Sequence, residues 1–597
     1  MKEKINNILK NINVVEWVLL AIVVSICFVC FQFPDILHTG GSSITYLNGN
    51  IRNFYEVNKK ALGSDNYMPT TYILFAVWNI LIRVLGLIKT PTMAVGAFVR
   101  MWYKLGTSIL YLATTILIYK ICKLRKLDTK TAAIGAFIFA SSPVGIFSQF
   151  IFGQYDIITT FFIVLGIYYY LQKKEKGFIA AFAVAVTCKY FALLVFIPLL
   201  LLREKNVWKI IKKVFAFGSL FIVETLFYIG SEAFKEGVFG FGATGYVFKL
   251  GLNNGYRTVS LFMMAWIILC AFSYFKEVDE KEEFEWIIYI LNILSFIMFG
   301  MSYWHPQWLL MAVPFWSLGL IFHKKSNIFM LLDALFGVVY IAFTVTAWYG
   351  SVDQHMFYGG IFRKYVEGCL QGKTSMAELL GITDLDMLFS ILASLMLVYA
   401  IFTHPKYLAK DEKEVMIENN KGLAQLRYLP GIGFFLIVAF TCLHMNMTSV
   451  VTFESGDSVN IIQTMDDSIV IEQKFLADSD TIDEFSIKTA TYDRKNNFEI
   501  KAYLMDLDGN ILTETQFNAS SLKDNAYKRF AFDKKVKVEI GQPYILKFVS
   551  EGATDTNTIS FYRGADKAED NLNMEYAIIG NNEQPYDISV RIFGDKE

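Results

Sequence analysis

The stretch "FGQYDIITTFFIVLGIYYYL", residues 152–171, places a single acidic residue, Asp156, at the start of a long apolar run. A carboxylate at the centre of a bilayer costs roughly 2.5–3.5 kcal/mol or more. We therefore expect a membrane-spanning helix that begins near residue 155, with Asp156 at the membrane surface. Runs of this kind recur along most of the chain and decide its fold class.

The composition of the whole chain is that of a membrane protein. Its 597 residues are 54% hydrophobic and 18% charged, with a mean hydropathy of +0.40. Apolar runs of roughly 18–22 residues recur between positions 14 and 445. The formal net charge is zero and the basic residues fall in short loops, so we expect no nucleic-acid partner. The seven cysteines lie mostly in apolar runs, which argues against a disulfide framework or a zinc site.

Clusters of Lys and Arg mark the cytoplasmic side of a membrane protein, and placing every such cluster inside predicts about thirteen transmembrane helices. The N-terminus is then cytoplasmic and the C-terminus lies outside. The first apolar run is long and lacks a small-residue cleavage site, so we expect a retained helix. The helices are predicted at roughly 14–33, 98–120, 131–150, 155–171, two short ones within 177–202, 208–229, 258–275, 285–301, 307–322, 328–348, 385–402 and 430–446.

Two apolar stretches need a different placement. If residues 67–87 crossed the membrane, the basic segment "KLRK" would lie outside. We therefore predict a helix on the outer face within a long external loop, residues 34–97; a tilted span is the alternative. Residues 177–202 have basic flanks on both sides, with Lys189 near the middle. Because an unpaired ammonium is costly in hydrocarbon, we predict two short helices that meet at Lys189 on the outer side, rather than one helix.

Residues 447–597 are predicted to form a second, extracellular domain that follows the membrane domain of residues 1–446. Apolar and polar residues alternate with period two in segments such as "FEIKAYLMD" and "VKVEIGQPYILKFVS", and "DLDGN" is a hairpin signal. We expect an all-β sandwich of about eight strands. It contains no catalytic constellation, so a passive or sugar-binding accessory role is the default.

Four polar features are predicted on the same outer side of the membrane. They are Asp35 after the first helix, the segment with Gln154, Tyr155 and Asp156, Lys189, and the segment "SYWHPQW" with Trp304, His305, Gln307 and Trp308. This set suits group transfer from a lipid-linked phosphate. A lysine neutralises the phosphate, and one carboxylate takes a proton from an incoming hydroxyl. The other carboxylate, alone or with a divalent metal such as Mg²⁺ or Mn²⁺, places or screens the phosphate.

Further residues are weaker candidates for the same site. Arg257, in the external segment 230–257, is a second candidate for binding the donor phosphate. The candidate metal ligands are Asp35 and Asp156. His38 and Glu56 are possible additional ligands by their proximity in sequence alone.

Each main feature also has a structural alternative. Asp35 and Asp156 stand where an acid caps the helix that follows it. His305, before a proline, suits an interfacial hydrogen bond, and Trp304 and Trp308 suit the membrane interface. Singly these signals are weak. Their convergence on one side of the membrane is the argument for a site.

The residue 152–171 stretch is similar to the GQ-x-D segment of bacterial mannosyltransferase-like members of the GT-C superfamily, including relatives of the GPI mannosyltransferases. The segment "SYWHPQWLLMAVPF", residues 302–315, resembles their late PQ(Y/W)LLW…PF segment. The resemblance spans roughly residues 14–350. It implies a polytopic glycosyltransferase that uses polyprenyl-phosphate sugars, with Asp35 as the catalytic base, Asp156 binding metal or acceptor, and Lys189 at the carrier phosphate. The chain departs from members with adjacent acids in the first loop, because Asp35 stands alone.

The predicted function is transfer of a hexose such as mannose from a polyprenyl-phosphate donor to a glycan or lipid of the cell envelope. The reaction is placed at the outer face of a bacterial plasma membrane. Inversion at the anomeric carbon follows if Asp35 activates the acceptor directly. The predicted substrate-binding residues are Gln154, Tyr155, Trp304, His305 and Gln307.

Two other functions compete with this one. The first is a transporter or flippase of lipid-linked glycans, although the sequence has no visible internal inverted repeat. The second is a non-catalytic envelope-assembly protein that acts through its β domain. A lipid-linked donor is favoured over a nucleotide sugar because the sequence has neither a P-loop nor a soluble Rossmann domain.

Overall fold

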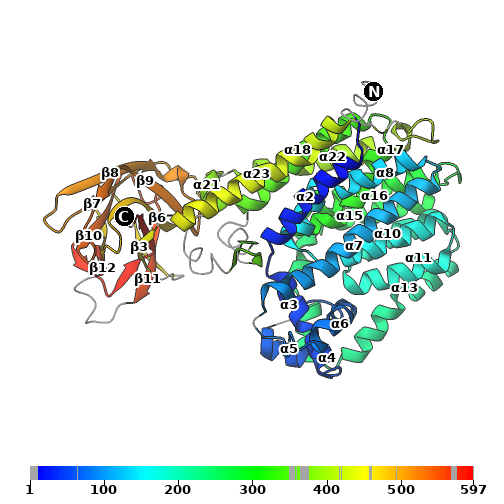
Figure 1. The fold of residues 1–597 in the computed structure, drawn as a ribbon, viewed down its shortest axis with the longest axis horizontal. Helices are drawn as coiled ribbons and strands as arrows, with labels where there is room; N and C mark the ends of the chain where they lie inside the picture. The colour runs from blue at the N-terminus through cyan, green and yellow to red at the C-terminus, as the bar shows by residue number, and fades with distance from the viewer. Residues whose placement is uncertain are drawn as a thin grey trace. The chain divides into compact units, whose positions relative to one another are not determined.

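The computed structural model describes residues 11–63, 65–93, 95–253, 255–347, 356–357, 359–363, 375–382, 384–415, 417, 420–448, 450–455, 460–492, 494–566 and 575–595. The chain divides into two compact units (Figure 1). Unit 1 comprises Met1–Thr344, His355–Arg363 and Asp386–Phe435, and unit 2 comprises Val345–Gln354, Lys364–Leu385 and Leu436–Glu597. The last division, at residue 436, lies close to the predicted boundary at 446/447. Unit 2 also takes in two shorter earlier segments.

The first three quarters of the chain form helices, as the apolar runs predict. The helices are α2 (Val14–Cys30), α3 (Asp35–Ser42), α4 (Ile44–Leu47), α5 (Phe54–Leu62), α6 (Pro69–Val84), α7 (Ala97–Leu124), α8 (Thr129–Ala140), α9 (Pro143–Ile146), α10 (Ile157–Leu171), α11 (Glu175–Cys188), α12 (Phe191–Arg203), α13 (Val207–Tyr228), α14 (Glu232–Phe234), α15 (Leu261–Phe275), α16 (Glu283–Gly300), α17 (Val313–Phe322), α18 (Ser326–Ala347), α21 (Met376–Leu380), α22 (Leu385–Phe402) and α23 (Lys421–Thr448). Shorter 3₁₀ or π turns are η1 (Phe147–Phe152), η2 (Lys235–Phe239), η3 (Gly242–Phe248), η4 (Pro306–Met311) and η5 (Pro405–Tyr407), and a small hairpin joins β1 (Gly251–Asn253) to β2 (Thr258–Ser260).

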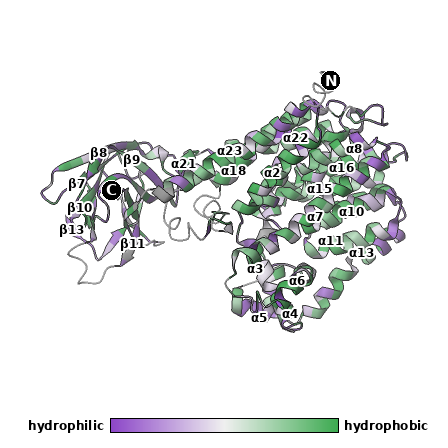
Figure 2. Cartoon of the chain, in the orientation of Figure 1, coloured by the Kyte–Doolittle hydropathy of each residue, from purple (hydrophilic) through white to green (hydrophobic). Residues whose placement is uncertain are grey.

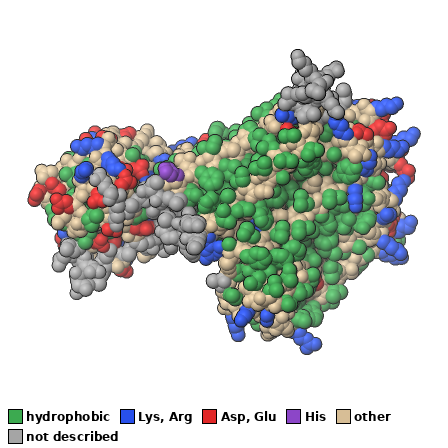
Figure 3. Space-filling view, in the orientation of Figure 1, with side chains coloured by type: hydrophobic (Ala, Val, Ile, Leu, Met, Phe, Trp, Pro, Cys, Tyr) green, Lys and Arg blue, Asp and Glu red, His purple; other side chains and the backbone are tan. Residues whose placement is uncertain are grey.

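The surface of unit 1 is that of a membrane-embedded bundle. Its helices are hydrophobic along most of their length (Figure 2). On the face shown in Figure 3, hydrophobic side chains cover this unit and charged side chains gather at its edges. Because hydrocarbon excludes charged groups, this distribution is the one expected of a multi-pass membrane protein.

The lengths of the described helices bear on the number of crossings. Five are long and apolar enough to span a bilayer, namely α7, α16, α18, α22 and α23. Two bent pairs would raise the number to seven: α2 with α3–α4, bent by 72°, and α8 with α9–η1, bent by 54°. Several other predicted crossings are shorter; α10 has only 15 residues, about 22 Å against a hydrocarbon core of ~30 Å. Helix α13 has 22 residues but is not among the five. The number of about thirteen crossings stays a prediction. The placement of α6 on the outer face also stays a prediction.

The predicted break at Lys189 is confirmed. Helix α11 ends at Cys188 and α12 begins at Phe191, and the backbone of Lys189 is extended, with φ −160° and ψ 135°. The rings of Phe182 and Phe196, at equal distances along the chain before and after Lys189, pack with their centroids 5.5 Å apart. The two helices therefore form a hairpin with Lys189 at its apex.

The helix predicted at 131–150 is wrong in one respect, because it is broken. Helix α8 ends at Ala140, and a new start at Pro143, whose cap Ser142 accepts the backbone N–H of Gly145, leads into the π-helical turn η1. Gly153 ends η1 with φ +78°, a left-handed conformation that glycine adopts without a steric penalty. Turns of the π type are frequent at functional sites, and this one leads directly into "QYD".

A buried lysine joins η1 to the end of α2. Lys104 of α7 is 1% exposed. Its ammonium donates to the carbonyl oxygens of Cys27, Phe28 and Phe150 at 3.2, 2.8 and 2.6 Å, and also to that of Phe31. Carbonyls at the C-terminal end of a helix have no intrahelical donor. The ammonium supplies that donor and fixes the chain just before Asp35.

Arg427 of α23 serves the end of α8 in a similar way. Its guanidinium donates to the hydroxyl of Ser141 at 2.7 Å and to the carbonyl oxygen of Ile138, and it pairs with the carboxylate of Asp333 on α18. Buried cations thus donate hydrogen bonds to carbonyl oxygens at both ends of the broken segment, Arg427 to Ile138 and Lys104 to Phe150.

We expect Lys104→Met to lower thermal stability strongly, because three buried carbonyl oxygens and the partly buried one of Phe28 lose their donor. An unsatisfied buried hydrogen-bonding group costs on the order of 1–3 kcal/mol. The measurement is thermal unfolding of the detergent-solubilised protein. Lys120→Met, at an exposed position of the same helix, is the matched control. Equal melting temperatures for the two variants would contradict this role of Lys104.

Unit 2 contains the predicted β-sandwich. One sheet has the strand order β13-β12-β5-β10-β7-β8; the other has β14-β11-β6-β15-β3, with β4 paired to β11 and β9 to β6. The "DLDGN" turn joins β7 to β8 as predicted, with Gly509 at φ +84°. Phe485 of β6 packs across the two sheets against Phe548 of β10 at 5.6 Å, and against Phe532 of β9 in its own sheet at 5.0 Å.

The described part of unit 2 has more strands than the eight predicted. The strands are β3 (Val450–Glu454), β4 (Ile461–Thr464), β5 (Ile471–Leu476), β6 (Thr481–Ala490), β7 (Glu499–Met505), β8 (Ile511–Asn518), β9 (Ala526–Lys537), β10 (Pro543–Glu551), β11 (Ser560–Asp566), β12 (Tyr576–Ile579), β13 (Asn582–Glu583), β14 (Tyr586–Ile588) and β15 (Val590–Gly594). Several have two to four residues, too few for an alternating pattern to stand out in the sequence.

Candidate functional site

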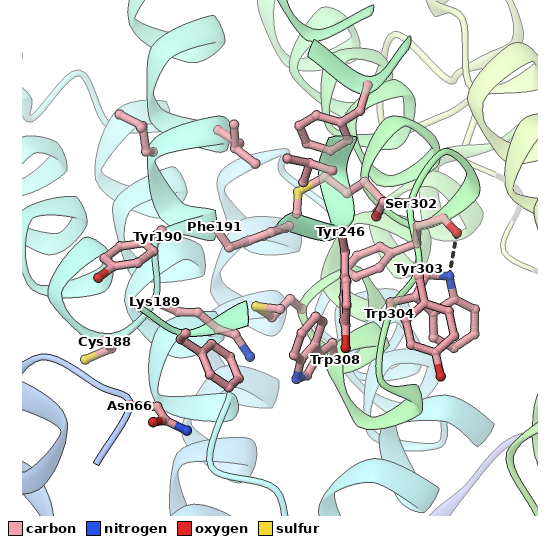
Figure 4. A pocket seen from close by; sticks show the side chains of 18 of the residues that line it. Asn66, Cys188, Lys189, Tyr190, Phe191, Tyr246, Ser302, Tyr303, Trp304 and Trp308 are labelled. Carbon is pink, nitrogen blue, oxygen red and sulfur yellow. Dashed lines mark hydrogen bonds between the residues drawn. The ribbon is translucent and has the colours of Figure 1, made fainter. Parts of the chain in front are cut away.

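Two cavities of unit 1 share part of their lining beside Lys189, and Figure 4 shows the apolar one. The apolar cavity, of about 380 Å³, is lined mainly by hydrophobic side chains of α12, η3, α15 and α16. The polar cavity, of about 510 Å³, is lined by residues of α3, the "GQYD" segment and the "HPQW" segment. The residues that line both are Asn66, Tyr67, Phe241 and Trp308. These four side chains form the boundary between an apolar and a polar compartment.

Lys189 and Asp156 form a buried ion pair at this boundary. The Lys189 ammonium lies 2.7 Å from a carboxylate oxygen of Asp156 and 4.6 Å from the centre of the Trp308 ring, toward which it points in Figure 4. The Asp156 side chain is 2% exposed and lines neither cavity, whereas Lys189 lines the apolar one. Asp156 makes no capping hydrogen bond to α10, so its partner is Lys189 rather than a helix end.

Asp35 is the first residue of α3 and lines the polar cavity. The backbone N–H of Phe33 donates to the carbonyl oxygen of Phe152 at 2.9 Å, which brings the chain before Asp35 beside the "GQYD" segment. Burial raises the pKa of Asp35 to about 6; the charge of Asp156 adds to this, while His38 and Lys189 oppose it. At neutral pH Asp35 is therefore a carboxylate whose pKa lies close to the working pH, as a general base requires.

His38 lies one helical turn after Asp35 and also lines the polar cavity. Its Nδ1 atom is 3.8 Å from a carboxylate oxygen of Asp65. Asp65 is held by the Ser42 hydroxyl at 2.8 Å and the Asn58 amide at 2.5 Å. This network fixes α3 against the loop before α6.

The binding of a metal ion by Asp35 and Asp156 stays a prediction. Among the described residues, no group of three or more His, Cys, Asp or Glu side chains is placed to bind a metal ion. The Asp156 carboxylate is already paired with Lys189, and Glu56 does not line the polar cavity.

The predicted substrate-binding residues divide between the two cavities. Gln154, Tyr155, His305 and Gln307 line the polar cavity. The Tyr155 hydroxyl donates to that of Tyr67 at 3.0 Å. These five side chains present hydroxyl, amide and imidazole groups to one compartment, a mixture suited to a polyhydroxylated ligand.

Two predicted residues lie elsewhere. Trp304 lines the apolar cavity, and its indole N–H donates to the carbonyl oxygen of Phe299 at 2.6 Å, which gives it a packing role. Arg257 lies in the exposed turn between β1 and β2 and lines neither cavity. Its predicted contact with the donor phosphate has no support in this arrangement.

Aromatic rings pack around His305, and one of them, Tyr246, was not indicated by the sequence. Tyr246 of η3 lies parallel to the His305 ring at 6.4 Å and edge-on to Tyr303 at 5.1 Å. The His305 ring also packs against Trp308 at 4.7 Å. Burial, together with the charge of Lys189, lowers the pKa of His305 to about 4. His305 is thus neutral at neutral pH, and its uncharged ring can donate or accept a hydrogen bond.

These features define a helical membrane protein with two adjoining cavities. The carboxylate of Asp35 lines the polar cavity, and Lys189 lines the apolar cavity beside their shared residue Trp308. Residues 67–332, somewhat under half of the chain, match the model of glycosyltransferase family 87. Over this segment, the match agrees with the resemblance to glycosyltransferases that the sequence motifs indicate.

Comparison with solved structures adds little to this match. The cryo-EM structure of arabinosyltransferase EmbB from Mycobacterium smegmatis aligns with a TM-score of 0.27 and 10% sequence identity, over 93% of this chain and 64% of that one. The chain thus spans less than two thirds of the length of EmbB, and the score is too low for the comparison to bear on fold or chemistry. No curated protein matches the sequence.

Proposed function

We propose that the protein transfers a sugar from a polyprenyl-phosphate donor to a hydroxyl of an envelope glycan or lipid, at the outer face of the membrane. The observation that best supports this is the junction of the two cavities at Lys189. A lipid-linked sugar has an apolar tail, a phosphate and a polar head in that order. Lys189 lines the apolar cavity, and its ammonium lies 4.6 Å from the centre of the Trp308 ring, which lines both cavities, so a donor could place its tail, phosphate and head in this order.

Lys189 suits the phosphate of such a donor. An ammonium has three N–H donors, and Asp156 takes one of them, so two remain for phosphate oxygens. The phosphodiester of the donor has a single negative charge, which a single lysine can balance. Asp156 holds the ammonium in place but also competes with the phosphate for it, which makes the strength of donor binding depend on both residues.

Asp35 is placed to act on the acceptor. Its carboxylate would take the proton of the acceptor hydroxyl while that oxygen attacks the anomeric carbon. The bond from the anomeric carbon to the phosphate oxygen breaks, and polyprenyl phosphate leaves with the electron pair. A direct displacement of this kind inverts the anomeric configuration. Mannose or another hexose is the sugar that the family resemblance implies, and Gln154, His305 and Gln307 offer hydrogen-bonding groups to its hydroxyls.

Donor binding tests the proposal most directly. We expect polyprenyl-phosphate sugars to raise the melting temperature of the purified protein and nucleotide sugars to leave it unchanged. Lys189→Ala should lose the effect, whereas Lys120→Ala, at an exposed position of α7, should keep it. Stabilisation by nucleotide sugars, or equal stabilisation of both variants by the lipid-linked donor, would contradict the proposed donor site.

The pKa of Asp35 predicts how the rate depends on pH. A general base works only when deprotonated, so kcat/KM should rise with pH and level off above the pKa of about 6. Below that pH it should fall roughly tenfold per unit as the carboxylate is protonated. The measurement is the transfer rate of the reconstituted protein between pH 4.5 and 8, a range chosen to bracket the pKa of about 6. A flat profile across pH 6 would argue against Asp35 as the base.

A further inference from the structure

The hairpin of β1 and β2 exposes an unusual amount of apolar surface. Its strands pair antiparallel, with Gly251 opposite Ser260, between η3 and the start of α15. The exposed hydrophobic side chains of the hairpin and the residues beside it are Phe248 (56%), Leu250 (46%), Leu252 (61%), Tyr256 (92%) and Val259 (42%). A hairpin this small has no core of its own in water, and clustered exposed apolar side chains mark an interaction surface.

This surface continues the lipid-facing side of the helix that follows. Helix α15 begins at Leu261, directly after β2, and exposes Met264, Ile267 and Ile268 by 41%, 56% and 64%. Its 15 residues span about 22 Å, short of a hydrocarbon core of ~30 Å. The apolar hairpin extends the same surface at the end of α15, so the combined element reaches the membrane interface.

The charge of the hairpin fits an anionic membrane surface. Lys249 and Arg257 are exposed, and the stretch 237–260 contains no Asp or Glu. The Lys249 ammonium lies 5.0 Å from the centre of the Tyr246 ring. Exposed tyrosines beside basic residues are typical of segments at the lipid headgroups, and each basic residue near an anionic leaflet contributes to binding.

We propose that the β1–β2 hairpin is an interfacial anchor that inserts into the headgroup region of the outer leaflet and binds anionic bilayer phospholipids through Lys249 and Arg257. The anchor is tied to the site, because the Leu261 N–H donates to the carbonyl of Leu250 at 3.1 Å, and the Ser260 hydroxyl donates to that of Val247 at 2.5 Å. Val247 lines the apolar cavity. The depth at which the hairpin inserts into the bilayer thus determines the position of Val247 in the cavity wall, whatever reaction the site performs.

Depth-dependent quenching tests the insertion. An environment-sensitive fluorophore is attached to Tyr256→Cys in the full-length protein in nanodiscs. Asp508→Cys, in the exposed β7–β8 turn, is the control. The six native cysteines in the described residues are free, so the labelling of wild type is measured and subtracted as background. We expect lipid-attached bromine to quench the label at 256 and aqueous iodide to quench the label at 508. Equal quenching of both labels by iodide would overturn the proposal.

Lipid-dependent stability tests the charge. Phosphatidylglycerol titrated into the detergent-solubilised protein should raise its melting temperature, and phosphatidylcholine should have a smaller effect. In Lys249→Gln/Arg257→Gln the half-saturating phosphatidylglycerol concentration should rise by roughly fivefold per charge removed. Lys534→Gln/Lys537→Gln, two exposed positions of β9, should titrate like wild type.

An unchanged titration in Lys249→Gln/Arg257→Gln would refute the phospholipid contact. These readouts involve no donor and no transfer, so their failure is separate from a failure of the proposed reaction. Lys189→Ala should keep the wild-type quenching pattern and the wild-type half-saturating phosphatidylglycerol concentration, because Lys189 lies inside the apolar cavity rather than on the hairpin. Its melting temperature without lipid should be lower, because the Asp156 carboxylate loses its partner.

Discussion

Asp35→Asn is expected to reduce transfer on the order of 10²–10⁴-fold while leaving donor binding intact, because an amide keeps the size of the side chain but cannot take a proton. Asp35 lines the polar cavity, and it is the first residue of α3, after the N-cap residue Pro34. Its loss should therefore cost little stability. The measurement is kcat of the reconstituted protein with a polyprenyl-phosphate sugar, beside the donor-induced rise in melting temperature.

Two controls make this result specific. Asp279→Asn, at an exposed loop position, should keep wild-type activity. Asp35→Glu should keep part of the rate, since it has a carboxylate on a side chain that is one methylene group longer. Activity of Asp35→Asn within tenfold of wild type would remove Asp35 from the role of base. Loss of donor stabilisation in the same variant would instead indicate that Asp35 shapes the donor site.

Features of the fold that depend on average properties were predictable from the sequence. Hydropathy was enough to find α7 or α18, because a bilayer selects for composition along a whole helix. The break at Lys189 was predictable because burying an unpaired ammonium in mid-helix is costly. The break after α8 was not, since its residues Ser141 and Ser142 look like ordinary parts of an apolar run and the break depends on Arg427, far away in the sequence.

The site was predictable to a similar degree. The sequence indicated Asp35, Asp156 and Lys189, because charged residues are conspicuous in an apolar chain, and the structure places Lys189 against Asp156. It could not indicate that Asp156 faces the lysine rather than the cavity. Tyr67 and Phe241, which line both cavities, were missed because aromatic residues are too common here to single out any of them.

The pair of Lys189 and Asp156 should show a second large effect, this time on stability. Lys189→Met leaves the Asp156 carboxylate, which is 2% exposed, without its partner. Removing one member of a buried pair costs roughly 3–5 kcal/mol. The double variant Lys189→Met/Asp156→Asn leaves no stranded charge and should regain most of the melting temperature. Glu280→Gln, which breaks the exposed pair with Lys173, should have little effect.

The same variants separate the structural role of the pair from donor binding. If Lys189 binds the phosphate, the double variant should be stable yet gain nothing from a lipid-linked sugar. Asp156→Asn alone should be less stable than wild type but gain more from the donor, because the phosphate then takes the place of the missing carboxylate beside the ammonium. Donor stabilisation of the double variant would place the phosphate elsewhere. A donor response of Asp156→Asn no larger than that of wild type would mean that Asp156 does not compete for the lysine.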